Sequence, residues 1–318
     1  MIRFVAAIFV VALAAGAALG AERMRSFAVP TGAHPHDVAP AADGGVWYTA
    51  QYQGALGHLD PKTGKTRQIP LGSGSAPHGV IVDRDGNAWV TDGGLNAIVK
   101  VDPATDRVTV FPLPETASNA NLNTATFDND GILWFTGQTG FYGRLDPHTG
   151  AMELFRAPKG RGPYGIDTAP DGNVYYASLA GSFVGLIDRA TGKTTILAPP
   201  TENQGARRVW ADSKSNLWVS EWNAGQVSRY DSHTQEWKSW KLPGDGARAY
   251  AVFVDDKDKV WLSDFNANAI LRFDPATESF TAFPSPRRGA RVRQILGRPG
   301  EVWAPESGTD TLVVIETD

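Results

Sequence analysis

One stretch of the chain decides the fold: residues 77–92 read PHGVIVDRDGNAWVTD. Two runs of β-branched and aromatic residues flank an Asp-Gly pair, which is typical of two strands joined by a tight turn. Two similar runs follow at residues 96–101 (NAIVKV) and 107–111 (RVTVF), with an Asp-Pro turn between them. Together these four runs predict an antiparallel meander of four short strands.

The same pattern recurs along the chain at intervals of about 43 residues. Each repeat has an aromatic residue at the equivalent place in its second strand: Trp47, Trp89, Trp134, Tyr175, Trp218, Trp261 and Trp303. A period of this length with four strands per unit is typical of blades stacked around a central channel. The sequence therefore predicts an all-β protein, a seven-bladed β-propeller of four-stranded antiparallel blades.

The last repeat, after residue 291, offers only three strands. Its missing outer strand is available at the other end of the chain, where residues 25–30 (RSFAVP) resemble outer strands such as residues 67–71 (RQIPL). An unpaired blade edge would expose backbone donors and acceptors. We therefore predict that the N-terminal strand pairs with the last blade and closes the ring, and that residues 22–318 form one propeller domain.

Residues 1–21 have the features of a cleaved secretory signal peptide. Residues 1–3 carry a positive charge, residues 4–13 are apolar, and small residues follow up to a plausible cleavage site after Gly20 or Ala21. The apolar run is short for a membrane span. We expect a periplasmic or secreted protein without a membrane partner after cleavage.

Composition excludes several classes of site and partner. The chain contains no cysteine, so it has no disulfides, thiolate metal ligands or cysteine nucleophile. A net charge of -4 and a pI near 5.9 argue against nucleic acid as a partner. We expect a monomer that binds a small molecule.

The channel mouth is the predicted ligand site. Alignment of the repeats places six polar or aromatic residues at one equivalent position in the first strand of successive blades: His36, His78, Asn123, Tyr164, Arg207 and Tyr250. In the seventh blade either Arg291 or Arg293 takes this place. A varied set of this kind is typical of a ring that faces a ligand, and a water-filled polar channel is the alternative.

A second equivalent position, three residues after the aromatic, is acidic in four blades: Asp92, Glu221, Asp264 and Glu306. Carboxylates near a channel mouth suit Mg²⁺ or Ca²⁺, although each acid could instead accept hydrogen bonds from its own loop. The two histidines at the first position, His36 and His78, lie on adjacent blades, where one could act as a general base. By contrast, His58 aligns with third-strand cations and is expected to be solvated.

These repeats resemble the virginiamycin B lyase, or streptogramin lyase, family over residues 25–318. The motifs that carry the resemblance are PHGV followed by DGNxW, LWFT at residues 133–136, NAI at residues 96–98 and GRL at residues 143–145. Active members of that family open a cyclic depsipeptide by elimination at its ester linkage, with a histidine base and Mg²⁺.

The resemblance implies roles for particular residues. His78 resembles the base, His36 the histidine of the preceding blade, and Asp92 is the nearest candidate for the acid on the metal side. The active lyases carry glutamate two residues before the base, whereas this chain has Ala76. Their histidine pair also lies in the last blades, and here it lies in the first two.

Three hypotheses follow. The first is an exported, Mg²⁺-dependent carbon–oxygen lyase that opens a cyclic ester, in which His36 and Tyr164 contact the substrate and Arg207 stabilises the developing negative charge. The second is a non-catalytic propeller that binds a ligand or a protein. The third is a calcium-dependent lactonase of the gluconolactonase type, with Asn123, Glu221 and Asp264 as candidate ligands.

Overall fold

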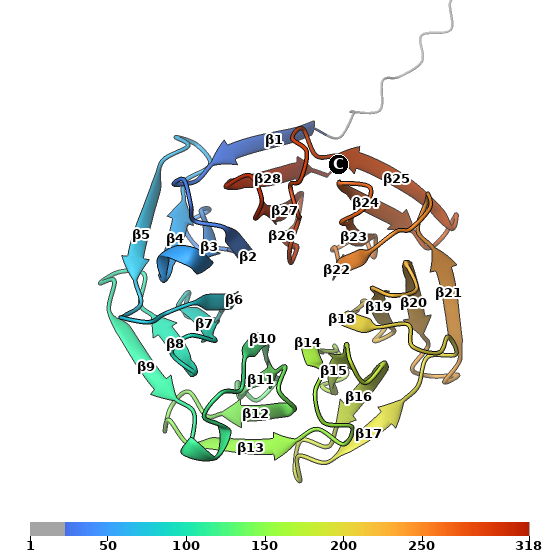
Figure 1. Cartoon of the computed structure of the whole chain (residues 1–318), viewed down its shortest axis with the longest axis horizontal. Coiled ribbons are helices and arrows are strands. Elements are labelled where there is room, and N and C mark those ends of the chain that lie inside the picture. The colour runs from blue at the N-terminus through green and yellow to red at the C-terminus, as the bar shows by residue number, and fades with distance from the viewer. Residues whose placement is uncertain (1–22, 318) are drawn as a thin grey trace, which may run out of the picture.

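The computed structural model describes residues 23–317, and seven four-stranded sheets form a closed ring (Figure 1). In each sheet the strand order runs outward from the channel, and every pairing is antiparallel. The first four blades are β2 (Pro35–Pro40), β3 (Val46–Ala50), β4 (Ala55–Leu59) and β5 (Thr66–Pro70); β6 (Pro77–Val82), β7 (Ala88–Asp92), β8 (Ala97–Val101) and β9 (Val108–Pro112); β10 (Leu122–Phe127), β11 (Leu133–Gly137), β12 (Phe141–Leu145) and β13 (Met152–Arg156); and β14 (Pro163–Thr168), β15 (Val174–Ser178), β16 (Phe183–Ile187) and β17 (Thr194–Leu197).

The remaining blades follow the same plan. They are β18 (Ala206–Ala211), β19 (Leu217–Glu221), β20 (Gln226–Tyr230) and β21 (Trp237–Lys241); β22 (Ala249–Val254), β23 (Val260–Asp264), β24 (Ala269–Asp274) and β25 (Ser279–Pro284); and β26 (Leu296–Arg298), β27 (Glu301–Glu306) and β28 (Thr311–Glu316) with β1 (Arg23–Ala28). Two short 3₁₀ helices, η1 (Gln51–Gln53) and η2 (Glu115–Ala117), lie in loops. The predicted seven-bladed fold is confirmed.

Ring closure by the N-terminal strand is also confirmed. β1 is the outer strand of the last blade and pairs with β28 from Arg23 opposite Glu316 to Ala28 opposite Thr311. The ring of Phe27 packs against Trp303, with centroids 5.6 Å apart. The strand begins two residues earlier than the sequence pattern indicated.

The predicted signal peptide lies outside the described residues, and the part of the chain that the structure describes contains no helix suited to a membrane span.

The recurring Asp and Trp form one structural unit in four of the repeats. In the second blade Asp83 accepts hydrogen bonds from the backbone N–H of Asn87 (2.8 Å) and from the indole of Trp89 (2.7 Å). Equivalent indole bonds join Trp134 to Asp128, Trp218 to Asp212 and Trp261 to Asp255. These acids therefore complete their own turns, as expected from the repeat.

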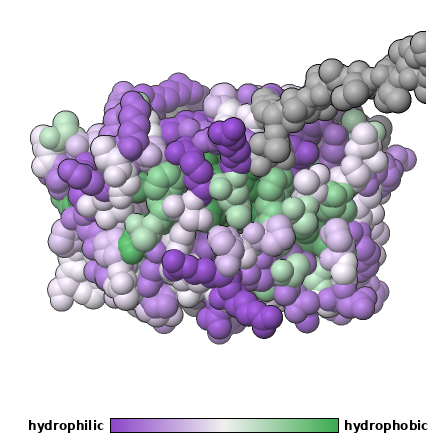
Figure 2. All heavy atoms as spheres, turned by 90° about the horizontal axis from the view of Figure 1, so that it is seen from above, coloured by the Kyte–Doolittle hydropathy of each residue, from purple (hydrophilic) through white to green (hydrophobic). Residues whose placement is uncertain are grey.

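The tryptophans are buried between blades and carry much of the core. Apolar residues show along the side of the ring between two polar faces (Figure 2).

The prediction that His58 is solvated was wrong. It is buried, pairs across the sheet with Trp47, and packs edge-on against that ring at 4.6 Å. Third-strand cations pack on their own tryptophans too, for example Lys100 on Trp89.

Candidate functional site

A β-bulge in the inner strands of the first six blades directs the predicted site residues into the channel. Pro77 pairs with Asp92 and Gly79 pairs with Thr91, so His78 is an extra residue without its own partner. The register shifts at the same place in β2, β10, β14, β18 and β22. Because a bulge breaks the alternation of side chains along a strand, it re-aims one of them.

Hydroxyl groups of the second strands hold these bulges against the next blade. Thr49 donates to the carbonyl of His78 (2.8 Å), and Thr91 donates to the carbonyl of Asn123 (2.6 Å). Ser220 makes the same bond to the carbonyl of Tyr250 (2.8 Å). His78, Asn123 and Tyr250 are thus fixed by the preceding blade. The sequence contained the signal, a Thr or Ser two residues after most repeat aromatics, but the repeat alignment did not use it.

The two predicted histidines lie in direct contact at the mouth. The ring centroids of His36 and His78 are 3.7 Å apart, and both side chains are buried. The Nδ1 of His78 lies 3.0 Å from the carbonyl oxygen of Asn123 and must donate to it, since a carbonyl only accepts. The Thr124 hydroxyl donates a hydrogen bond to Asn123 Oδ1, so the amide nitrogen Nδ2 is the atom that faces His78. Asn123 Nδ2 lies 3.3 Å from His78 Nε2 and donates to it. His78 is therefore neutral, with its lone pair on Nε2.

A chain of hydrogen bonds crosses the mouth from the other side. Arg207 donates to the Tyr164 hydroxyl (2.7 Å), and the hydroxyls of Tyr164 and Tyr250 are 2.8 Å apart. Tyr250 in turn lies 3.2 Å from His36 Nε2, and His36 Nδ1 lies 2.7 Å from Asp37. All six predicted mouth residues are therefore brought together, and polar contacts link four of them in one directed chain.

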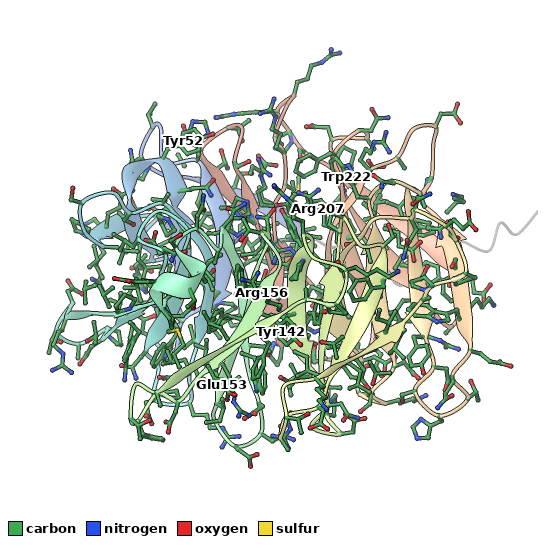
Figure 3. All side chains as sticks on the ribbon, turned by 60° about the horizontal axis from the view of Figure 1, so that its bottom comes forward. Tyr52, Tyr142, Glu153, Arg156, Arg207 and Trp222 are labelled. Carbon is green, nitrogen blue, oxygen red and sulfur yellow. The ribbon has the colours of Figure 1, made fainter. Side chains whose placement is uncertain are left out.

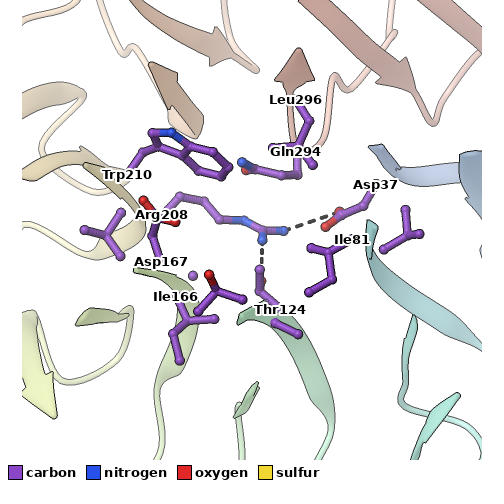
Figure 4. Close-up of a pocket in the computed structure, with 14 residues that line it drawn as sticks. Asp37, Ile81, Thr124, Ile166, Asp167, Arg208, Trp210, Gln294 and Leu296 are labelled. Carbon is purple, nitrogen blue, oxygen red and sulfur yellow. Dashed lines mark hydrogen bonds and ion pairs between the residues drawn. The ribbon is translucent and has the colours of Figure 1, made fainter. Parts of the chain in front are cut away.

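Arg208 closes the floor of this site. Its side chain is 1% exposed and stretches across the channel from β18 to Asp37 of β2 (3.5 Å) and to Thr124 of β10 (Figure 4). A cavity of about 60 Å³ lies beside it. The repeat alignment missed Arg208 and Asp37, because each follows the aligned position by one residue. In a regular strand such a neighbour would face away from the ligand position.

The open side of the site has aromatic walls and two half-buried arginines. The Arg207 guanidinium lies 3.9 Å from the centre of the Tyr250 ring and 4.6 Å from that of Trp222 (Figure 3). Phe265 stacks on Tyr250 at 4.7 Å.

The backbone bridge between residue 292 and residue 306 decides which arginine of the seventh blade is equivalent to His78. It corresponds to the pairing of Pro77 with Asp92, so the equivalent residue is Arg293. Arg293 reaches the Tyr250 hydroxyl at 3.4 Å.

Burial and the arginines set the protonation of the site. Burial lowers the pKa of His36 well below its usual value, and the guanidiniums of Arg293, Arg208 and Arg207 lower it further. The pKa of His78 is also well below its usual value, first because of burial and then because of His36. Burial raises the pKa of Tyr250, but the same three arginines outweigh it and lower that pKa to about 8.

The acids at the ends of the second strands serve their own loops. Asp92 accepts hydrogen bonds from Ser75 Oγ (2.5 Å) and from the backbone N–H groups of Ala76 (2.9 Å), Gly94 (3.0 Å) and Leu95 (2.9 Å). Asp264 is held the same way in its blade. Both oxygens of Asp92 are therefore occupied, as the loop alternative requires, and its assignment as a magnesium ligand stays a prediction.

The site as described does not fit Mg²⁺ well. The group of potential ligands that converges at the mouth, among residues 23–317, is His36, Asp37 and His78, whose ligating atoms lie within 4.8 Å of one another. Mg²⁺ prefers several oxygen ligands, and this set offers one carboxylate, which is already paired with Arg208. We therefore derive no chemical step through a metal.

Comparison with known proteins identifies the family. The model of the virginiamycin B lyase family matches residues 13–261 and residues 66–318. This chain belongs to the virginiamycin B lyase family. A streptogramin B lyase structure is 21% identical, with a TM-score of 0.85 over 93% of this chain and 98% of that one. Virginiamycin B lyase from Staphylococcus aureus is 18% identical, with a TM-score of 0.86 over 94% of this chain and 100% of that one.

More distant propellers share the architecture. One, solved with a bound peptide, is 14% identical, with a TM-score of 0.73 over 93% of this chain and 96% of that one. No match was found among curated proteins. At these low identities the solved structures support the fold of this virginiamycin B lyase family member and do not show its chemistry. The chemistry is therefore inferred from the residues at the channel mouth.

Proposed function

We propose that this protein is an exported lyase-like propeller that opens a cyclic ester by elimination at the channel mouth. The observation that carries the proposal is the contact between His36 and His78, with a neutral His78 whose Nε2 lone pair is held ready by its neighbours. A neutral imidazole can accept a proton at Nε2, and the lowered pKa of His78 makes it a weaker base than an exposed histidine.

In the proposed reaction His78 Nε2 takes the proton from the carbon next to a carbonyl group. The carbon–oxygen bond of the ester then breaks, a carbon–carbon double bond forms, and the electron pair leaves on the carboxylate. The guanidinium of Arg207 supplies positive charge at the open side of the mouth, where it stabilises the developing anion. His36, Asn123, Tyr164 and Tyr250 surround and orient the substrate.

A magnesium ion and export from the cell are two further parts of this proposal. If Mg²⁺ binds, it supplies charge stabilisation, and Asp92 is the predicted ligand. Calorimetric titration with Mg²⁺ tests this, and an absence of heat at millimolar ion removes the metal from the proposal. Export rests on the predicted signal peptide, and cleavage after residue 20 or 21 is measured by N-terminal sequencing of the protein purified from its source.

We expect the rate to be independent of pH between an acid limb, set by His78, and an alkaline limb, set by Tyr250. The pKa of His78 lies well below its ordinary value, so the base stays neutral as the pH falls through 6.5, and the rate declines only at lower pH. A second decline is expected above about pH 8, where Tyr250 ionises and can no longer donate to His36. Tyr250→Phe should lose the alkaline limb and keep the acid limb. An acid limb centred at the ordinary histidine pKa would contradict this assignment.

A non-catalytic binding role is the second candidate function. The observation that favours it is the partly buried pair Trp222 and Phe265 on the rim, whose ring centroids are 5.3 Å apart. Aromatic residues of this kind anchor ligands and proteins at interfaces. Binding of a ligand without any turnover would favour this role.

A further inference from the structure

The mouth holds more positive charge than its one contacting acid can balance. Three guanidiniums converge on the Tyr250 ring: Arg207 at 3.9 Å, Arg293 at 5.3 Å and Arg208 at 5.8 Å. Asp37 lies 3.5 Å from Arg208, at the floor. Within residues 23–317, neither Arg207 nor Arg293 forms an ion pair with a carboxylate, and their polar contacts are to hydroxyl groups.

Among residues 23–317, the acids of the neighbouring blades have other partners than Arg207 and Arg293. Asp264 accepts backbone N–H groups of its own loop, and Glu306 accepts the hydroxyl of Thr309. Glu221 is bonded to Gln226, and burial raises the pKa of its carboxyl to about 7, which weakens its charge near neutral pH. The guanidiniums of Arg207 and Arg293 therefore remain available to an incoming anion.

The two half-buried arginines also sit beside an apolar surface. Arg207 packs against Trp222 at 4.6 Å, and Arg293 packs against Phe265 at 5.4 Å. A guanidinium held by aromatic rings loses little further freedom when it binds a planar anion in a two-point contact. The aromatic rings would cover an apolar group attached to that anion.

We propose that the channel mouth is a carboxylate-binding site, and that its ligand is an acid whose carboxylate lies between Arg207 and Arg293 while an adjoining aromatic or apolar group packs on Trp222 and Phe265. This deepens the proposed function and rests on it for the place of the ligand, because opening an ester by elimination releases a carboxylate at this mouth. The binding itself requires no turnover.

The test uses benzoate as the probe and benzamide as its uncharged counterpart, with calorimetric titration of the purified chain. We expect benzoate to bind in a salt-dependent way and benzamide to bind at least about tenfold more weakly, since the arginines recognise the charge. Arg207→Gln and Arg293→Gln should each weaken benzoate binding about tenfold or more. Arg67→Gln, which removes the same charge from the outer strand β5, should leave it unchanged.

Arg207→Lys removes the guanidinium group and keeps the positive charge. It should therefore retain more affinity for benzoate than Arg207→Gln, if the loss in Arg207→Gln is a loss of charge. Equal affinity for benzoate and benzamide, or unchanged binding in both glutamine variants, would overturn the carboxylate site. Benzoate binding without turnover of any cyclic ester supports the carboxylate site and removes the lyase. Turnover of a cyclic ester that benzoate does not inhibit supports the lyase and removes the carboxylate site.

Discussion

Replacing His78 with alanine is expected to lower the rate of ester elimination by a factor of about 10² to 10⁴, the usual range for loss of a general base. The physical reason is the placement of its Nε2, which is unprotonated because Nδ1 donates to the carbonyl of Asn123. The rate is measured as single-turnover formation of the unsaturated product, with folding checked by circular dichroism.

Matched histidine variants make this test specific. His148 is exposed on the turn between β12 and β13, the two outer strands of the third blade, so His148→Ala should leave the rate unchanged. His36→Ala should mainly raise KM, since His36 contacts the ring of the base and the Tyr250 hydroxyl. Turnover that survives His78→Ala at the original rate would place the base elsewhere.

Deleting residues 22–30 is expected to have the largest effect on stability. The deletion removes β1 and uncovers the whole edge of β28, together with the face of Trp303 that Phe27 covers. We expect the melting temperature to fall by about 10 °C or more, with aggregation, because a long unpaired edge strand recruits other chains. Differential scanning calorimetry and light scattering measure the two effects.

The reference for this deletion is the chain that begins at residue 22. A synthetic peptide of residues 22–30 provides the control, since it should pair with β28 in trans and raise the melting temperature of the shortened chain again. Equal melting temperatures and solubility for the shortened and reference chains would show that ring closure does not depend on β1.

The repeat made the fold and most of the site predictable. The tryptophans recur because each one is buried between neighbouring blades and most bond the acid of their turn, as Trp89 does with Asp83. Equivalent positions in a closed ring must converge on the channel, so aligning the repeats was enough to bring His36, His78 and Tyr250 together. The same logic placed β1 beside β28 across the whole length of the chain.

Other parts of the site could not be predicted, for a physical reason. The bulge turns two consecutive residues toward the channel, so Asp37 and Arg208 escaped a pattern that assumes alternating sides. The acid at Asp92 could be a ligand or a turn acceptor by sequence alone, and the hydrogen bonds of its turn became visible only in the structure. For His58, the expectation that third-strand cations are solvated hid its packing on Trp47.

The central claim is that the mouth performs elimination, and the mass of the product tests it most directly. Incubation of the purified chain with a cyclic depsipeptide of the streptogramin B type should give a linear product of unchanged mass. That product should carry a new carbon–carbon double bond, seen as added ultraviolet absorbance, because elimination transfers a proton and breaks the ester without adding water. A linear product heavier by one water would show hydrolysis, and an intact ring after prolonged incubation with this and other cyclic esters would contradict the claim.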